Sequence, residues 1–102
     1  MAEPRIPFSR DAVIAFCEKY GVAEFALFGS VLRDDFRPDS DVDVLVAFKP
    51  DSPGITLENM FDMQDELEAI FGRKVDLVER RRVTNPFRRH EIITTRRVIH
   101  AA

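Results

Sequence analysis

The chain has 102 residues, of which 45% are hydrophobic, and a formal net charge of −3. This length supports one domain with a single modest core but not two, so we expect residues 1–102 to form one domain. The lone cysteine excludes an internal disulfide, and no apolar run has the length of a signal peptide or a membrane span. These features predict a cytoplasmic protein without a membrane partner.

The first predicted element is a helix that Ser9 can cap and Gly21 can end. Its apolar residues recur at three- and four-residue spacing: Val13, Phe16, Cys17 and Tyr20. Cys17 has no His or Asp partner within sequence reach, which favours a buried structural thiol over a nucleophile.

A short apolar strand over 24–28 leads into Gly29-Ser30, and a segment of helical character follows. At such a junction, free backbone N–H groups and the positive end of a helix dipole attract anions, and glycine lets a phosphate approach the backbone. The Ser30 hydroxyl adds a donor. A Gly-Ser dipeptide is also an ordinary turn, so this phosphate-site prediction depends on the motif that follows it.

Asp41 and Asp43 flank Val42 at the start of the next apolar strand. Because side chains of a strand alternate between faces, both carboxylates project from one face while Val42, Val44 and Val46 point to the other. Two carboxylates so close repel each other unless a cation lies between them, and their hard oxygens suit Mg²⁺ or Mn²⁺. The alternative is a pair of solvated acids at a strand start.

Residues 49–54 have the composition of a loop, and Gly72 can close the helix that follows. The predicted apolar face of this helix comprises Leu57, Met60, Phe61, Gln64, Leu67, Ile70 and Phe71. For Met60 and Met63 we favour core packing over an adaptable binding face.

Asp76 lies in the middle of a further short strand over 74–78, where an unpaired charge is costly. If this strand pairs beside 42–46, Asp76 faces the same cleft as Asp41 and Asp43, and three carboxylates can hold two metal ions. Otherwise Asp76 is an edge-strand residue that faces water or pairs with an arginine, and of the two alternatives we favour the carboxylate cluster.

Asn85 as cap and Pro86 at the first helical position open a last predicted helix. Its residues Ile92, Ile93, Val98 and Ile99 can dock on the sheet, which makes the predicted order αβαβαβα. Residues 79–102 hold seven arginines against two acids. With Phe87 as the single aromatic there, a solvated face or a protein-partner surface is favoured over nucleic-acid binding. His90 and His100 are too far apart on one helix face for one metal site.

Ten residues separate Gly29-Ser30 from Asp41-x-Asp43, and Asp76 follows on a later strand. This arrangement resembles the minimal nucleotidyltransferase group of the DNA polymerase beta superfamily. Further similarity lies in Phe28, Arg33, Pro38, Ser40 and residues 85–93, so nearly the whole chain is covered. The resemblance implies an α/β (α+β) nucleotidyltransferase core with a small mixed sheet flanked by helices. Many relatives carry Gly after the motif arginine, where this chain has Asp34-Asp35, which predicts a more acidic helix start and lower nucleotide affinity.

The resemblance also implies a mechanism. Asp41, Asp43 and Asp76 would hold two Mg²⁺ ions that clamp ATP and activate an acceptor hydroxyl. Asp76 would also accept the proton, while Gly29 and Ser30 would hold the leaving phosphates. Arg33 can neutralise charge in the transition state or pair with Asp34 or Asp35.

No residues remain for a domain that binds the acceptor, so the acceptor must arrive on a partner. Prokaryotic proteins that resemble this chain are antitoxins that add AMP to a tyrosine of a HEPN-domain ribonuclease toxin, and this is the function that the resemblance implies. Two alternatives stay open: an antitoxin that neutralises its partner by binding alone, and a small-molecule nucleotidyltransferase. The exposed sheet edge and the arginine-rich end permit a homodimer or a hetero-complex.

Overall fold

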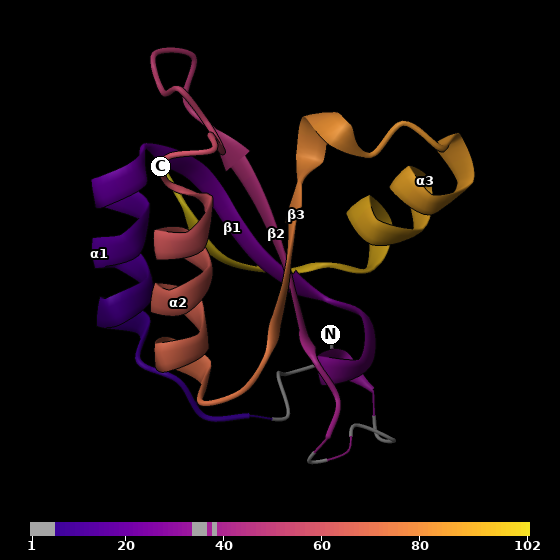
Figure 1. The fold of residues 1–102 in the computed structure, drawn as a ribbon. Coiled ribbons are helices and arrows are strands. Elements are labelled where there is room, and N and C mark those ends of the chain that lie inside the picture. The colour runs from indigo at the N-terminus through magenta and orange to yellow at the C-terminus, as the bar shows by residue number, and fades with distance from the viewer. Residues whose placement is uncertain (1–5, 34–36, 38) are drawn as a thin grey trace.

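The protein folds into a four-stranded mixed sheet with helices on both faces (Figure 1). The computed structural model describes residues 6–33, 37 and 39–102. Its elements are α1 (Arg10–Tyr20), β1 (Val22–Phe28), η1 (Gly29–Leu32), β2 (Val42–Phe48), α2 (Met60–Phe71), β3 (Val75–Glu79), η2 (Arg80–Arg82), α3 (Pro86–Thr95) and β4 (Arg97–Ala101), where η marks a 3₁₀ helix. The strand order is β3-β2-β1-β4, with β1 antiparallel to both neighbours and β2 parallel to β3. The predicted small mixed sheet with flanking helices is confirmed.

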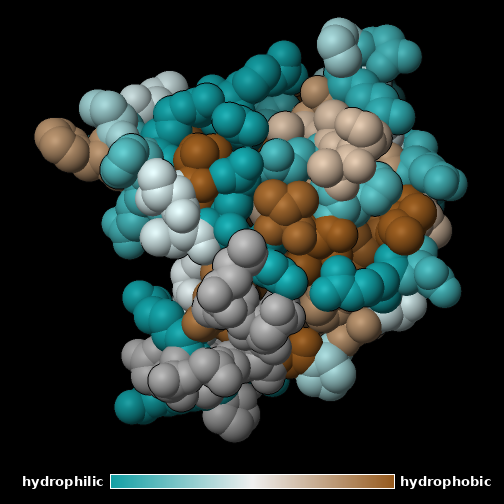
Figure 2. All heavy atoms as spheres, turned by 180° about the vertical axis from the view of Figure 1, so that it is seen from behind, coloured by the Kyte–Doolittle hydropathy of each residue, from teal (hydrophilic) through white to brown (hydrophobic). Residues whose placement is uncertain are grey.

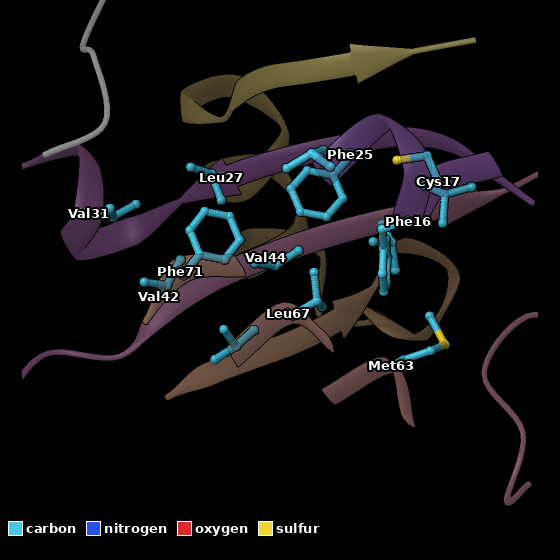
Figure 3. Packing of buried hydrophobic residues seen from close by; sticks show 14 of the residues in the cluster. Phe16, Cys17, Phe25, Leu27, Val31, Val42, Val44, Met63, Leu67 and Phe71 are labelled. Carbon is cyan, nitrogen blue, oxygen red and sulfur yellow. The ribbon is translucent and has the colours of Figure 1, made fainter. Parts of the chain in front are cut away.

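Alternation along the strands builds two different faces. Val42, Val44 and Val46 of β2 are buried in the larger hydrophobic cluster, which includes side chains of α1 and α2. Figure 3 shows this cluster, in which Phe25 stacks on Phe71 with ring centroids 6.4 Å apart. The opposite face holds a smaller cluster, made by Ala26, Phe28, Leu45, Val83 and Ile92. Helices α1 and α2 therefore cover one face and α3 covers the other (Figure 1).

Helix α1 forms as predicted. The Ser9 Oγ accepts a hydrogen bond from the Ala12 backbone N–H at 3.1 Å, and Gly21 ends the helix in the left-handed conformation with φ 70°. Cys17 is buried, and burial together with the neighbouring Glu18 charge raises the pKa of its thiol to about 12. A thiol that stays protonated is a poor nucleophile, which agrees with the structural role predicted for it.

The predicted face of the second helix is partly wrong. Its buried residues are Met63, Leu67 and Phe71, whereas Phe61 is 72% exposed and Leu57 precedes the helix and is 87% exposed. Met60 is also exposed, so core packing is confirmed for Met63 alone of the two methionines. The periodic pattern was extended one turn too far toward the N-terminus, because Thr56 and Asn59 form a local turn before the helix begins.

The predicted last helix is too long. Helix α3 ends at Thr95, and Val98 and Ile99 belong to strand β4, which pairs with β1. Without β4, the backbone groups on one side of the buried strand β1 would have no partner, and β-branched residues suit that position. His100 accordingly lies on β4 and not on a helix with His90.

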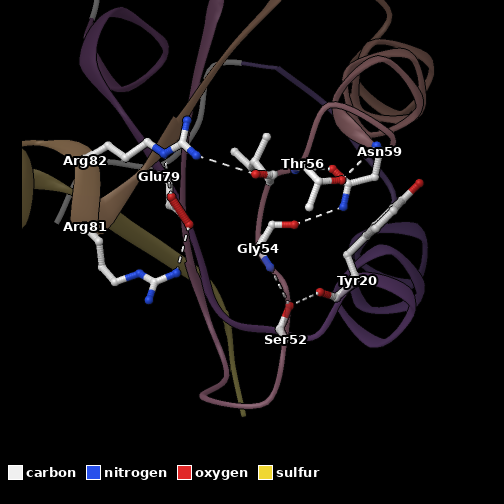
Figure 4. Close-up of polar contacts among 9 residues, drawn as sticks. Tyr20, Ser52, Gly54, Thr56, Asn59, Glu79, Arg81 and Arg82 are labelled. Atoms are coloured by element: carbon white, nitrogen blue, oxygen red, sulfur yellow. Dashed lines mark hydrogen bonds and ion pairs between the residues drawn. The ribbon is translucent and has the colours of Figure 1, made fainter.

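A polar network anchors the loop between β2 and α2 (Figure 4). The Ser52 hydroxyl donates to the Tyr20 carbonyl at 2.9 Å, and the Asn59 side-chain amide donates to the Gly54 carbonyl at 2.9 Å. On the other side, the buried Glu79 pairs with Arg81 at 3.3 Å and with Arg82 at 3.0 Å. The end of β3 is thereby tied to η2.

In the part of the chain that the structure describes, no helix is both long enough and apolar enough to cross a membrane. The predictions for Asp34, Asp35 and Pro38 fall outside the described residues.

Candidate active site

Asp41, Asp43 and Asp76 lie at the same end of two neighbouring strands. Asp43 and Asp76 are direct partners in the parallel pairing of β2 with β3, and Asp41 precedes β2 by one residue. Partners in a sheet share a face, so Asp43 and Asp76 project side by side, on the face away from Val42 and Val44. The predicted pairing of the Asp76 strand with the Asp41-x-Asp43 strand is confirmed. Asp76 and Asp41 are exposed and Asp43 is half-buried.

The electrostatics of Asp43 reflect this crowding. Burial raises the pKa of Asp43, and the negative charges of Asp76 and Asp41 raise it further. A hydrogen bond from the Ser30 backbone N–H and the positive charge of Arg33 lower this pKa, but the net shift is upward. Burial and the two neighbouring carboxylates therefore outweigh the donor and the cation that favour the charged form of Asp43.

The three carboxylates interact but do not converge. Within residues 6–33, 37 and 39–102, no three His, Cys, Asp or Glu side chains are grouped closely enough to hold a metal ion. The donor set nevertheless suits Mg²⁺, because it consists of hard carboxylate oxygens in a locally negative corner. A divalent ion would have to draw these side chains together.

The turn after β1 contacts Asp43 directly. Gly29 has φ +73°, and a Cβ at this position would overlap Oδ2 of Asp43 and lie 3.3 Å from its Cγ. Glycine thus suits the backbone conformation, and any other residue here would force the Asp43 carboxylate to shift. The local reason is the register, in which Phe28 is the partner of Asp43 across β1 and β2.

The sequence predicted a segment of helical character after Gly29-Ser30. Among the described residues, this segment is only the four-residue 3₁₀ helix η1. So short an element contributes little dipole, and the Ser30 N–H that was expected to meet a phosphate donates to Asp43 instead. A phosphate bound at this turn would therefore compete with the Asp43 carboxylate for that donor.

Sequence reasoning missed a cavity beside this corner. It has a volume of about 400 Å³ and lies between the turn after β1 and helix α3. Its apolar lining comprises Phe28, Leu32 and Ile92, and its polar lining comprises Arg33, Arg88, Glu91 and Thr95. The hydrophobic periodicity of α3 indicated Ile92 as a docking residue, but no local pattern shows which turn α3 approaches.

Much of the C-terminal arginine segment is engaged within the chain. Arg96 donates to Glu24 at 2.7 Å, Arg80 lies 3.9 Å from the same carboxylate, and Arg89 donates to the Arg80 carbonyl at 2.9 Å. These contacts hold η2 and α3 against β1. They account for three of the seven arginines of residues 79–102.

A family model described as "nucleotidyltransferase domain" matches residues 10–100. The chain belongs to the nucleotidyltransferase domain family. Protein adenylyltransferase MntA of Thermococcus cleftensis is 43% identical over 61 residues, which are 60% of this chain and 59% of that protein. The chain thus matches about three fifths of the length of this relative.

Two solved structures extend the comparison. A chain described as a minimal nucleotidyltransferase is 35% identical, with a TM-score of 0.69 and 86% of both chains covered. A complex of tri-AMPylated Shewanella oneidensis HEPN toxin with MNT antitoxin matches at a TM-score of 0.64 and 17% identity, covering 91% of this chain and 70% of that one. At this low identity, the second likeness shows a shared fold.

Proposed function

We propose that this protein is a Mg²⁺-dependent adenylyltransferase that moves AMP from ATP to a tyrosine of a HEPN-domain ribonuclease toxin and thereby acts as its cytoplasmic antitoxin. The observation that carries the proposal is the pairing of Asp43 with Asp76 beside the Gly29 turn. The relative named protein adenylyltransferase and the AMPylated toxin in the neighbouring structure support the choice of AMP and of a protein acceptor.

In this proposal Asp41, Asp43 and Asp76 hold the metal. A bound Mg²⁺ supplies positive charge that offsets the triphosphate and lowers the pKa of an acceptor hydroxyl. The raised pKa of Asp43 fits this role, since a bound cation would offset both causes of the shift, the burial of the carboxylate and its repulsion by Asp76 and Asp41.

Residues of the chain carry out the remaining steps of the proposed transfer. The acceptor oxygen forms a bond to the α-phosphorus while the bond from that phosphorus to the diphosphate breaks. Asp76 takes the proton of the hydroxyl, because it is exposed on the edge strand β3, where an acceptor can approach. The Gly29-Ser30 turn receives the leaving diphosphate, for which glycine leaves room.

Exposed apolar side chains support a protein acceptor. Leu57, Phe61 and Phe87 are 87%, 72% and 85% exposed. Burial of such side chains against a partner protein would remove apolar surface from water. They lie at the N-terminal ends of α2 and α3.

The experiment is a transfer assay with the full chain, labelled ATP, Mg²⁺ and the toxin encoded beside it. Asp43→Asn should reduce labelling of the toxin by about 10²–10³-fold, because the metal contributes several kcal/mol and each 1.36 kcal/mol is tenfold. Asp51→Asn, an exposed loop substitution, is the matched control and should label normally. Absence of label with the wild-type chain, or equal labelling by Asp43→Asn, would reject the proposal.

An antitoxin that acts by binding alone is a second candidate, favoured by the finding that the three carboxylates do not form a ready metal group among the described residues. It predicts that Asp43→Asn still neutralises the toxin in cells. Loss of protection with this variant would exclude it.

A further inference from the structure

The proposed chemistry does not use the cavity between the turn after β1 and helix α3. It adjoins the carboxylate corner through Gly29, which lines the cavity and contacts Asp43. Figure 2, which views the molecule from behind, shows a hollow at the edge of the molecule beside the region of α3. A ligand part placed here is therefore continuous with one placed at Asp43.

We infer that this cavity binds the nucleoside of the donor triphosphate and that α3 supplies the nucleoside-recognising wall. This inference rests on the proposed function, since it assumes that the chain binds a nucleoside triphosphate. The volume of about 400 Å³ lies in the range of pockets that take small organic ligands.

The apolar and acidic parts of the lining suit a nucleoside better than phosphates, and Arg33 and Arg88 are the cations in it. Phe28, Leu32 and Ile92 offer an apolar surface, which suits the flat face of a base and gives a diphosphate no donor. The Glu91 carboxylate repels phosphate oxygens but can accept hydrogen bonds from ribose hydroxyls or from base amino groups. Arg88 stands on the same helix face, one turn before Glu91 and Ile92, where its planar guanidinium can stack on a base.

Thr94 and Thr95 provide a matched pair for a test. Both are exposed, and each hydroxyl donates to a helix carbonyl one turn back: Thr94 to His90 at 2.7 Å and Thr95 to Glu91 at 2.6 Å. Thr95 lines the cavity, whereas Thr94 is not among the residues found to line it. A tryptophan at position 95 should fill the cavity, and one at position 94 should extend into solvent.

The experiment measures binding of ATP and of inorganic tripolyphosphate to the full chain with Mg²⁺, by calorimetry and without a toxin. Thr95→Trp should weaken ATP binding about tenfold or more and leave tripolyphosphate binding unchanged, because that probe lacks the nucleoside. Thr94→Trp should change neither affinity. A second variant, Glu91→Gln, should weaken ATP binding several-fold without weakening tripolyphosphate binding, which keeps the test decisive if Thr95→Trp does not fold.

The two possible failures are distinguishable. A wild-type chain that binds neither ATP nor tripolyphosphate contradicts the proposed function itself. Wild-type ATP binding that is unaffected by Thr95→Trp and Glu91→Gln, or an equal loss of ATP and tripolyphosphate affinity in both, overturns the cavity inference and leaves the transferase proposal standing.

Discussion

The two faces of the sheet are built for different tasks. The face under α1 and α2 packs Val42, Val44 and Val46 against fully buried side chains such as Met63 and Leu67. The face under α3 has a five-residue cluster, open space beside it, and the side chains of Asp43 and Asp76. Strand alternation separates the two, so that one strand, β2, contributes to the core on one side and carries a carboxylate of the proposed active site on the other.

Because of this separation, substitutions on the two faces should affect different properties, stability on one face and ligand binding and transfer on the other. Changes on the α1 and α2 face should lower stability and spare the site in molecules that remain folded. Changes on the α3 face should alter ligand binding and transfer at a smaller cost in stability. Two pairs of variants and one single variant test the contrast.

The largest effect on stability is expected from Leu67→Ala. Leu67 is fully buried, so its truncation should lower the free energy of unfolding by about 2–5 kcal/mol. Ile92→Ala, next to an existing cavity on the other face, should cost less stability and weaken ATP binding more. Urea unfolding and calorimetry on the folded fraction measure both quantities, and a greater loss of ATP affinity in Leu67→Ala would contradict the division.

An intermediate effect on stability is expected when alanine replaces either of two glycines that share one backbone conformation. Gly29 and Gly72 have φ +73° and +70°, but a Cβ at Gly72 meets nothing within 4 Å, whereas one at Gly29 overlaps Asp43. Gly72→Ala should therefore show the backbone cost alone, about 1–2 kcal/mol, with normal transfer. Gly29→Ala should cost more and displace the carboxylate, so that transfer is lost. Equal thermal stability and equal transfer in the two variants would show that the Gly29 contact with Asp43 has no consequence.

The smallest effect on stability is expected from Asp43→Asn, and it is a gain in stability at pH 7. Because the pKa of Asp43 is raised above its ordinary value of 3.8, the folded state binds the Asp43 proton more tightly than the unfolded state does. The resulting contribution to stability is present below pH 3.8 and is lost as the pH rises through the raised value. At pH 7 without metal, the asparagine variant should therefore be the more stable protein, and this advantage should shrink in acid.

Magnesium should change the relative stability of the wild-type chain and Asp43→Asn. Adding Mg²⁺ at pH 7 should raise the unfolding temperature of the wild-type chain more than that of Asp43→Asn, because an ion bound to the folded state stabilises it. Thermal melts across pH, with and without Mg²⁺, measure both effects. An asparagine variant that is less stable at pH 7 would show that burial and the neighbouring carboxylates do not destabilise the charged form of Asp43.

Local patterns were reliable where short-range physics decides the outcome. Ser9 and Gly21 bound α1 as expected, since caps depend on neighbouring backbone groups. Asn85 likewise accepts hydrogen bonds from the N–H groups of Phe87 and Arg88 at the start of α3. The patterns failed at Leu57, Phe61 and Val98, because periodicity alone does not say which apolar residues find a partner or when a neighbouring strand needs one.

From the sequence alone came the Gly29-Ser30 turn, the shared face of Asp41 and Asp43, and the resemblance to nucleotidyltransferases, because each depends on spacing along one short segment. The tertiary structure decided that Asp76 lies beside Asp43, that β4 completes the sheet, and that α3 encloses a cavity next to the turn. Those outcomes depend on register and packing between segments far apart in the chain. No local pattern encodes them.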